Sequence, residues 1–224
     1  MNKKIITVIA ICAVILIGVF SIYWKISDNN PYNKYKNISA KEVLNQKEDK
    51  YFVYYYMKDC YYCNLVKENI FKYASDNSNT YFVDLEKYSK DRETFDWVEF
   101  NSKNDIEVGT SKDGKTITYY PNENEEKYLN TIEKNKYGKA KQYEIIIADQ
   151  EYQNTNKNAK IGKVYASLLI PEINYSQYKY GDKIVIAGAP TLFKVENGKI
   201  SDFYFDSRDI NEFLEGDSND VQND

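Results

Sequence analysis

The chain of 224 residues contains no histidine, and this absence excludes several kinds of functional site. Without an imidazole there is no Ser-His-Asp or Cys-His nucleophilic site, no zinc site with histidine ligands and no haem with a histidine axial ligand. Any chemistry must therefore use cysteine, carboxylate, lysine, tyrosine or serine side chains.

An excess of basic charge is also missing. The 30 basic and 34 acidic residues give a formal net charge of −4. Proteins that bind nucleic acid usually carry a basic patch, so we expect no nucleic-acid partner. Hydrophobic residues make up 42% of the chain and charged residues 29%, which is typical of a globular protein. The length suffices for one domain with an anchor and an additional segment.

An almost unbroken apolar run occupies residues 5–24. About 20 helical residues span a hydrocarbon core of about 30 Å. Lys3 and Lys4 precede the run, which favours a cytoplasmic N-terminus. We therefore expect residues 1–4 in the cytoplasm, a single-pass membrane anchor over 5–24, a linker over 25–37 and an extracytoplasmic remainder. The expected location is the cell membrane.

A cleaved signal peptide is the alternative interpretation of this run. A signal peptide has a shorter apolar core and ends in small residues, whereas this run ends in Ile22, Tyr23 and Trp24. A lipoprotein site at Cys12 is disfavoured because the bulky Ile11 precedes it. The uncleaved anchor is favoured, with Cys12 inside the bilayer.

Four elements are expected around a pair of cysteines. Residues 51–57 are aromatic and β-branched, which predicts a buried strand. The spacing of apolar residues predicts a helix over 61–73, and residues 81–85 predict a second strand. A capping-box pattern predicts a short helix over 39–46.

Cys60 and Cys63 form a C-x-x-C pair at the start of the expected helix. Unpaired amides and the helix dipole at a helix N-terminus favour a thiolate, which is the nucleophile of thiol chemistry. Cys63 lies one helical turn further on, where it can resolve a mixed disulfide. Half a zinc site and a structural disulfide are the alternatives. Zinc needs four ligands, and a second pair is missing, so we expect no metal and no cofactor.

The end of the chain predicts a hairpin followed by a helix. A strand that begins with proline covers 190–195, an Asn-Gly turn covers 196–199 and the returning strand covers 200–205. A short helix is expected over 207–215, with its first residue as the N-cap. An acidic, disordered tail is expected over 217–224.

A long segment, about 88–182, separates the two regions. A strand over 115–120, a helix over 123–135 and a pair of strands over 142–148 and 164–170 are expected there. Its aromatic residues form either a small core of its own, which is favoured, or a lid or partner-docking surface. They are Phe95, Trp97, Phe100, Tyr119, Tyr120 and Tyr143.

The order strand, C-x-x-C, helix, strand, and then Gly188-Ala189-Pro190-Thr191 before a hairpin resembles the thioredoxin-like superfamily. The resemblance covers roughly residues 38–87 and 183–216. It implies an α/β, thioredoxin-like domain over 38–216, interrupted by a large insertion at about 88–182 before the cis-proline strand and preceded by one transmembrane helix.

The resemblance also implies the roles of individual residues. A cis-proline in this position packs against the dithiol and keeps metals off it, whereas an ordinary strand-edge proline is the alternative. The implied catalytic residues are Cys60 and Cys63, and the implied substrate-binding residues are Tyr61, Ala189, Pro190 and Thr191.

The sequence departs from the thioredoxin pattern at three places. Tyr54 stands where many thioredoxins have a buried aspartate that assists proton transfer at the second cysteine. Tyr61 and Tyr62 replace the usual residues between the cysteines, on which the redox poise depends, so the direction of electron flow stays open. The third departure is the length of the insertion.

Two functions follow as hypotheses. The first is an enzyme, a thiol–disulfide oxidoreductase that acts on exported or cell-envelope proteins containing thiols or disulfides and is recycled by a membrane redox partner. The alternative is an accessory or binding subunit of an export, conjugation or bacteriocin system with little redox turnover. Membrane-tethered thioredoxin-like accessory proteins of bacteriocin systems in Gram-positive bacteria are similar in layout.

Overall fold

The computed structural model describes residues 30–220. The predicted anchor at residues 5–24 and the last residues of the predicted tail, 221–224, lie outside this part. The described residues form five α-helices and three β-sheets, which confirms the predicted mixed α/β class. No helix within them is both long and apolar enough to cross a membrane.

The chain divides into two units, residues 1–37 and residues 38–224. In the first, the 3₁₀ helix η1 (Pro31–Lys34) occupies part of the predicted linker. Asn30 caps it by accepting a hydrogen bond of 3.1 Å from the Tyr32 amide.

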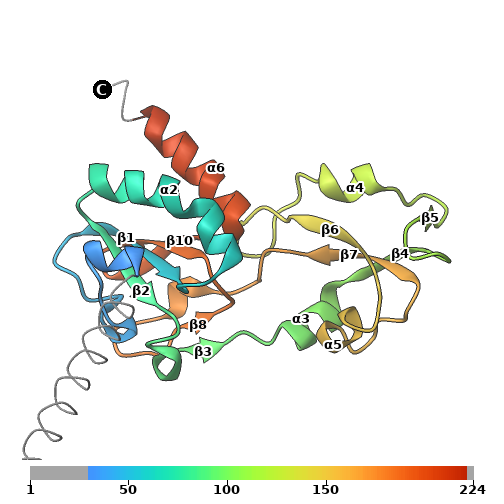
Figure 1. Cartoon of the computed structure of the whole chain (residues 1–224), viewed down its shortest axis with the longest axis horizontal. Helices are drawn as coiled ribbons and strands as arrows, with labels where there is room; N and C mark the ends of the chain where they lie inside the picture. Colours follow the sequence, from blue (N-terminus) through green and yellow to red (C-terminus); the bar gives the residue numbers. More distant parts are fainter. Residues whose placement is uncertain (1–29, 221–224) are drawn as a thin grey trace, which may run out of the picture. The chain divides into compact units, whose positions relative to one another are not determined.

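The first sheet has the strand order β10-β9-β1-β2 (Figure 1). Its central strand β1 (Lys50–Tyr56) is parallel to β2 (Thr80–Asp84) and antiparallel to β9 (Thr191–Glu196). β10 (Lys199–Phe205) completes the sheet beside β9. All residues of β1 after the first are buried, as expected of a strand that is covered on both faces.

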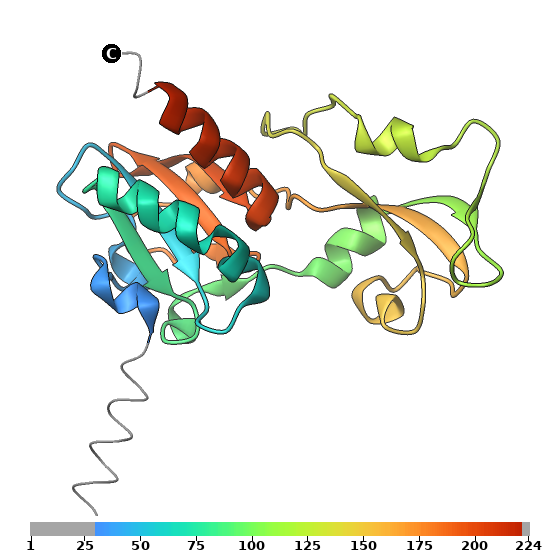
Figure 2. The same ribbon diagram turned by 45° about the horizontal axis from the view of Figure 1, so that its top comes forward.

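Two helices, α2 (Tyr61–Asp76) and α6 (Asp206–Asp220), pack against each other on one side of this sheet (Figures 1 and 2). Phe52 of β1 contacts both helices. Its ring centroid lies 5.4 Å from that of Tyr73 in α2 and 5.6 Å from that of Phe213 in α6. The Phe52–Tyr73 pair is edge-to-face, an arrangement that adds to the stabilisation from burial alone.

The other face of β1 packs against a segment that returns from the insertion. This segment contains the 3₁₀ helix η4 (Tyr175–Gln177). The Tyr175 ring lies 4.7 Å from both Phe193 of β9 and Phe203 of β10, and Phe193 lies 5.2 Å from Tyr55 of β1. The end of the inserted segment is therefore part of the core of the first sheet.

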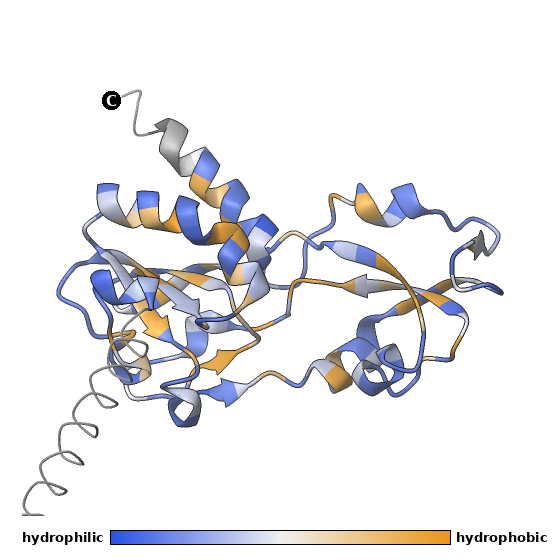
Figure 3. Ribbon diagram, in the orientation of Figure 1, coloured by the Kyte–Doolittle hydropathy of each residue, from blue (hydrophilic) through white to orange (hydrophobic). Residues whose placement is uncertain are grey.

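The chain between β2 and β9 contributes the other two sheets. β3 (Glu93–Thr94) pairs in parallel with β8 (Val185–Ile186). An antiparallel sheet of four strands has the order β5-β4-β7-β6, with bounds β4 Ile106–Thr110, β5 Thr118–Tyr119, β6 Tyr143–Ile147 and β7 Lys163–Leu168. Figure 3 shows hydrophobic residues on β6 and β7. A separate buried cluster includes Phe100, Val108, Tyr143 and Val164.

Several elements of the inserted segment differ from the predictions. The strand expected over 115–120 shrinks to β5, because Asp113 accepts backbone hydrogen bonds from Lys115 and Thr116 and forms a turn. The helix expected over 123–135 is only α4 (Glu125–Leu129). The sequence did not predict the 3₁₀ turn η3 (Ser89–Asp91), α3 (Trp97–Asn104) or α5 (Tyr152–Thr155).

Two helix ends also differ from the predictions. The short helix expected over 39–46 is only the 3₁₀ turn η2 (Ala40–Glu42), although its capping box forms. α6 begins at Asp206, so Ser207 lies inside the first turn and is not the N-cap. α6 also continues to Asp220, so the predicted disordered tail begins with four helical residues.

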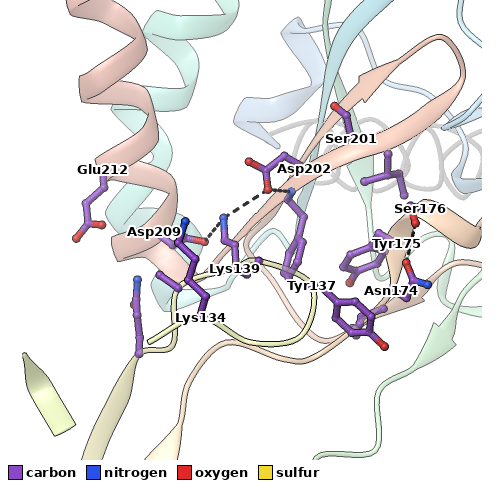
Figure 4. A pocket seen from close by; sticks show the side chains of 16 residues that line it. Lys134, Tyr137, Lys139, Asn174, Tyr175, Ser176, Ser201, Asp202, Asp209 and Glu212 are labelled. Carbon is purple, nitrogen blue, oxygen red and sulfur yellow. Dashed lines mark hydrogen bonds and ion pairs between the residues drawn. The ribbon is translucent and has the colours of Figure 1, made fainter. Parts of the chain in front are cut away.

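The loop after α4 is fastened to the first sheet by Lys139 (Figure 4). Its ammonium nitrogen lies 3.4 Å from Asp209 Oδ2 of α6 and 3.7 Å from Asp202 Oδ1 of β10. The same nitrogen lies 4.2 Å from the centre of the Tyr204 ring, a cation–π geometry. Lys139 therefore joins the inserted segment to the last strand and the last helix.

Candidate functional site: the Cys60–Cys63 pair

The two cysteines lie where β1 ends and α2 begins. Cys60 is the N-cap residue of α2, with extended backbone dihedrals. Its sulfur accepts a hydrogen bond of 3.1 Å from the backbone amide of Cys63. An amide hydrogen bond and the positive end of the helix dipole both stabilise a thiolate at this position. Both thiols are free in this structure.

The strand register brings the predicted proline segment to the same place. Thr191, the first residue of β9, pairs with Tyr55 near the end of β1. The Cys60 thiol donates a hydrogen bond of 3.4 Å to the Ala189 carbonyl oxygen. The Ala189–Pro190 peptide bond is cis, as the thioredoxin-like resemblance implied. Cys60, Ala189 and Pro190 therefore meet across 129 residues of sequence.

Two other predicted substrate-binding residues differ in exposure. Thr191 is fully buried, and its hydroxyl donates to the Gly188 carbonyl oxygen at 2.8 Å, so its side chain holds the backbone of this segment. Tyr61 is 69% exposed and its neighbour Tyr62 is 54% exposed. Together with the exposed Leu65 they form an apolar patch on the first turns of α2, beside the thiols.

The two thiols differ in environment. Cys60 retains 9% of its surface and Cys63 only 1%. Burial raises the pKa of the Cys63 thiol, and its hydrogen bond and charge interaction with Cys60 raise it further. Hydrogen bonds from the Met57 backbone and the Tyr54 side chain oppose this rise in the pKa of Cys63. In the reduced protein, the Cys63 thiol therefore stays protonated at neutral pH.

A groove of about 530 Å³ begins beside the dithiol. Tyr62 and Ala189 line it from the side of the cysteines. The first sheet and α6 contribute Phe205, Asp206 and Arg208. The inserted segment contributes the remaining wall: Trp97, Asn101, Glu144, Ile146, Tyr152, Thr155, Ser167, Leu168 and Leu169.

Trp97 joins the inserted segment to the proline segment. Its indole N–H donates a hydrogen bond of 2.8 Å to the Ala187 carbonyl oxygen, two residues before Ala189. Its ring lies 5.8 Å from the Phe205 ring of β10. The sequence singled out Trp97 only as one of several aromatic residues and missed Glu144, Asp206 and Arg208, because nothing local marks them as neighbours of the cysteines.

A buried polar cluster holds Tyr152, one of the residues that line the groove. Asp105 Oδ2 accepts hydrogen bonds from the Tyr152 hydroxyl and, at 2.7 Å, from the Asn156 amide nitrogen. Burial raises the pKa of Asp105, and these hydrogen bonds oppose the rise. Across residues 30–220, no three or more cysteine and carboxylate side chains are grouped so that they could hold a metal ion.

Comparison with protein-family models, curated proteins and solved structures finds no match to this chain. The geometry of the Cys60–Cys63 pair is therefore the main indication of function in this chain.

Proposed function

We propose that the chain is a thiol–disulfide oxidoreductase with a thioredoxin-like domain, in which Cys60 attacks or is attacked and Cys63 resolves. One observation carries the proposal. The Cys60 sulfur lies at the N-terminus of α2, accepts the Cys63 amide and contacts the Ala189 carbonyl, while Cys63 is buried behind it. A purely structural pair has no need for this difference between the two thiols.

The reaction follows from these positions. In the reducing direction the Cys60 thiolate attacks one sulfur of a substrate disulfide, that disulfide bond breaks, and the departing sulfur leaves as a thiolate that takes a proton. Cys63 then loses its proton and attacks the Cys60 sulfur. A Cys60–Cys63 disulfide forms and the second substrate thiol leaves. The oxidising direction is the same sequence reversed.

The order of strands and helices around the site supports the thioredoxin-like assignment. A central strand, β1, leads to the cysteines, α2 follows, β2 is parallel to β1, and the hairpin β9–β10 lies on the other side with α6 after it. The apolar run at residues 5–24 supports an anchor that leaves this domain outside the cytoplasm. Exported proteins with thiols or disulfides are then the substrates, and a membrane partner recycles the dithiol.

The test uses the full chain in detergent, with Cys12→Ser so that only two of the three cysteines remain. The protein is equilibrated with glutathione buffers and the dithiol fraction is measured by alkylation and mass. We expect a reversible two-electron transition. A potential near −270 mV would indicate a reductant and one near −120 mV an oxidant, these being rough values for thioredoxin and for a strong periplasmic oxidase.

Single-cysteine variants separate the two roles. Cys63→Ala should accumulate a mixed disulfide with glutathione through Cys60, whereas Cys60→Ala should form one far more slowly because Cys63 is buried. A pair that does not equilibrate with any glutathione ratio would overturn the proposal and favour the accessory-subunit hypothesis, in which the cysteines have a structural role.

A further inference from the structure

The groove beside the dithiol has a negative lining. Its charged lining residues are Glu144 of β6, Asp206 and Arg208 of α6, so two carboxylates face one guanidinium. The Glu144 side chain is exposed, but partial desolvation raises the pKa of its carboxyl, and the negative charges of Asp206 and Asp105 raise it further against the effect of Arg208. With both carboxylates ionised, the lining carries two negative charges against the one positive charge of Arg208.

Asp206 is held at this place by its backbone. Its φ is +69°, in the left-handed region that non-glycine residues adopt only rarely. Its amide donates a hydrogen bond of 3.2 Å to the Pro190 carbonyl oxygen, and its carboxylate accepts from the Ser207 amide and hydroxyl. Strained residues of this kind concentrate at functional sites. The carboxylate is thus fixed next to the segment that contacts Cys60.

A second observation also indicates a ligand with hydrogen-bond donors. Asn101 of α3 lines the groove and is only 8% exposed. Its side-chain oxygen accepts no hydrogen bond from residues 30–220. A buried acceptor without a donor is unfavourable. This oxygen is covered in the structure, so a donor on a bound ligand would satisfy it once the Asn101 side chain turns toward the groove. The aromatic rings of Tyr62 and Trp97 line the same groove and favour a cation over an anion.

We propose that this groove binds an extended, positively charged segment of the substrate polypeptide next to its reactive cysteine, with Glu144 and Asp206 as specificity-determining residues. Ala189 both accepts the hydrogen bond from the Cys60 thiol and lines the groove, so the groove begins next to the attacking sulfur. The inference rests on the proposed function for the chemistry at Cys60, but the binding of the segment is testable without it.

The binding test uses the full chain in detergent with all cysteines changed to serine, so that no redox step contributes. Two labelled peptides of nine residues are compared by fluorescence anisotropy. Both have a central serine in place of the cysteine, one with lysines on either side of it and the other with glutamates. We expect the lysine peptide to bind at least tenfold more tightly at low salt. The difference should shrink above about 0.1 M salt, where the screening length is about 10 Å.

Variants assign the preference to the groove. Glu144→Gln with Asp206→Asn should lower the preference to threefold or less, and asparagine tolerates the left-handed backbone as aspartate does. Glu126→Gln with Glu215→Gln removes the same charge from two exposed positions outside the groove and should keep the preference.

The single variant Glu144→Lys should shift the preference toward the glutamate peptide. Because Glu144 is exposed, we expect this variant to fold even if the double variant does not. Equal binding of the two peptides, no binding of either, or a preference that the groove variants leave unchanged would each overturn the inference. A lysine preference in a protein whose dithiol does not equilibrate with glutathione would instead support the groove and refute the oxidoreductase.

Discussion

Trp97 is the contact through which a change in the inserted segment should reach the proline segment. Trp97→Phe keeps an aromatic ring and removes the hydrogen bond of 2.8 Å to the Ala187 carbonyl. One such bond contributes about 0.5–1.5 kcal/mol. Since the ring itself is only partly buried, we expect Trp97→Phe to lower the free energy of unfolding by about 1 kcal/mol.

Trp97→Ala also removes the packing of the indole ring. Its centroid lies 5.0 Å from the Phe95 ring, 5.7 Å from Phe100 and 5.8 Å from Phe205. A buried tryptophan replaced by alanine costs about 3–5 kcal/mol, and partial exposure places Trp97 at the low end, about 3 kcal/mol. Because the hydrogen bond fixes Ala187, we also expect both variants to increase the alkylation rate of Cys60, which the neighbouring Ala189 carbonyl partly covers.

The assay is urea unfolding of the full chain in mild detergent, followed by far-ultraviolet circular dichroism, together with the rate of Cys60 alkylation. Ile132→Ala is the control, since this side chain is almost completely exposed and its loss should change stability by less than about 0.5 kcal/mol. Two results would contradict this role of Trp97. The first is that Trp97→Ala lowers the free energy of unfolding no more than Ile132→Ala does. The second is that Trp97→Ala is destabilising but leaves the rate of Cys60 alkylation unchanged.

Three further predictions concern the dithiol, the third sheet and the loop after α4. In the reduced protein Cys63 has a raised pKa, so its contribution to stability should be full below the ordinary thiol pKa of 9.0 and fall above it, by at most about 1.4 kcal/mol per pH unit. Buried tyrosines with raised pKa values, such as Tyr55 and Tyr175, add a slope of the same sign, so Cys63→Ala should make the fall between pH 9 and 10 shallower without removing it. An unchanged slope would contradict the assignment. Gly109→Ala should destabilise by about 1–3 kcal/mol in thermal unfolding. The added Cβ would lie 2.6 Å from the Thr118 carbonyl oxygen, so an unchanged melting temperature would show that β5 moves freely. Lys139→Met should lower the free energy of unfolding in urea by about 3 kcal/mol, because it leaves the mostly buried Asp209 carboxylate without its cation. This loss of stability should become smaller on acidification, as Asp209 becomes protonated. A loss that does not depend on pH would argue against this cause.

The elements next to the cysteines follow from local sequence signals. The aromatic and β-branched run before Cys60 forms β1, and the capping-box pattern at Ser39 forms its predicted hydrogen bonds. The Asn197-Gly198 turn has φ values of +51° and +71°, which glycine and asparagine adopt most readily and which a tight hairpin requires. Each of these signals lies within a few residues of the structure that it predicts.

The inserted segment was much less predictable because long-range contacts determine it. α3 is a short amphipathic helix whose Trp97 finds its hydrogen-bond acceptor 90 residues further along the chain. The strands β3 and β8 have two residues each, too few for any periodicity, and they pair across more than 90 residues. The polar cluster around Asp105 likewise includes Tyr152 of α5 and Asn156 at the end of α5, about 50 residues further along the chain. Trp97 and Tyr152 line the groove through contacts of this long-range kind, so the residues of the groove could not be assigned from the sequence.

The position of the insertion gives it a direct connection to the dithiol. The chain leaves the first sheet after β2 and returns through β8 to the segment that ends at Ala189, so the returning end of the insertion leads to the Cys60 contact. Two contacts far apart in sequence then hold the inserted sheet in place: Trp97 to Ala187, and Lys139 to the carboxylates of β10 and α6. Each contact joins the insertion to an element that borders the groove or the thiol. A substitution in either contact should therefore change access to Cys60 without touching a cysteine, which an independently folded appendage could not do.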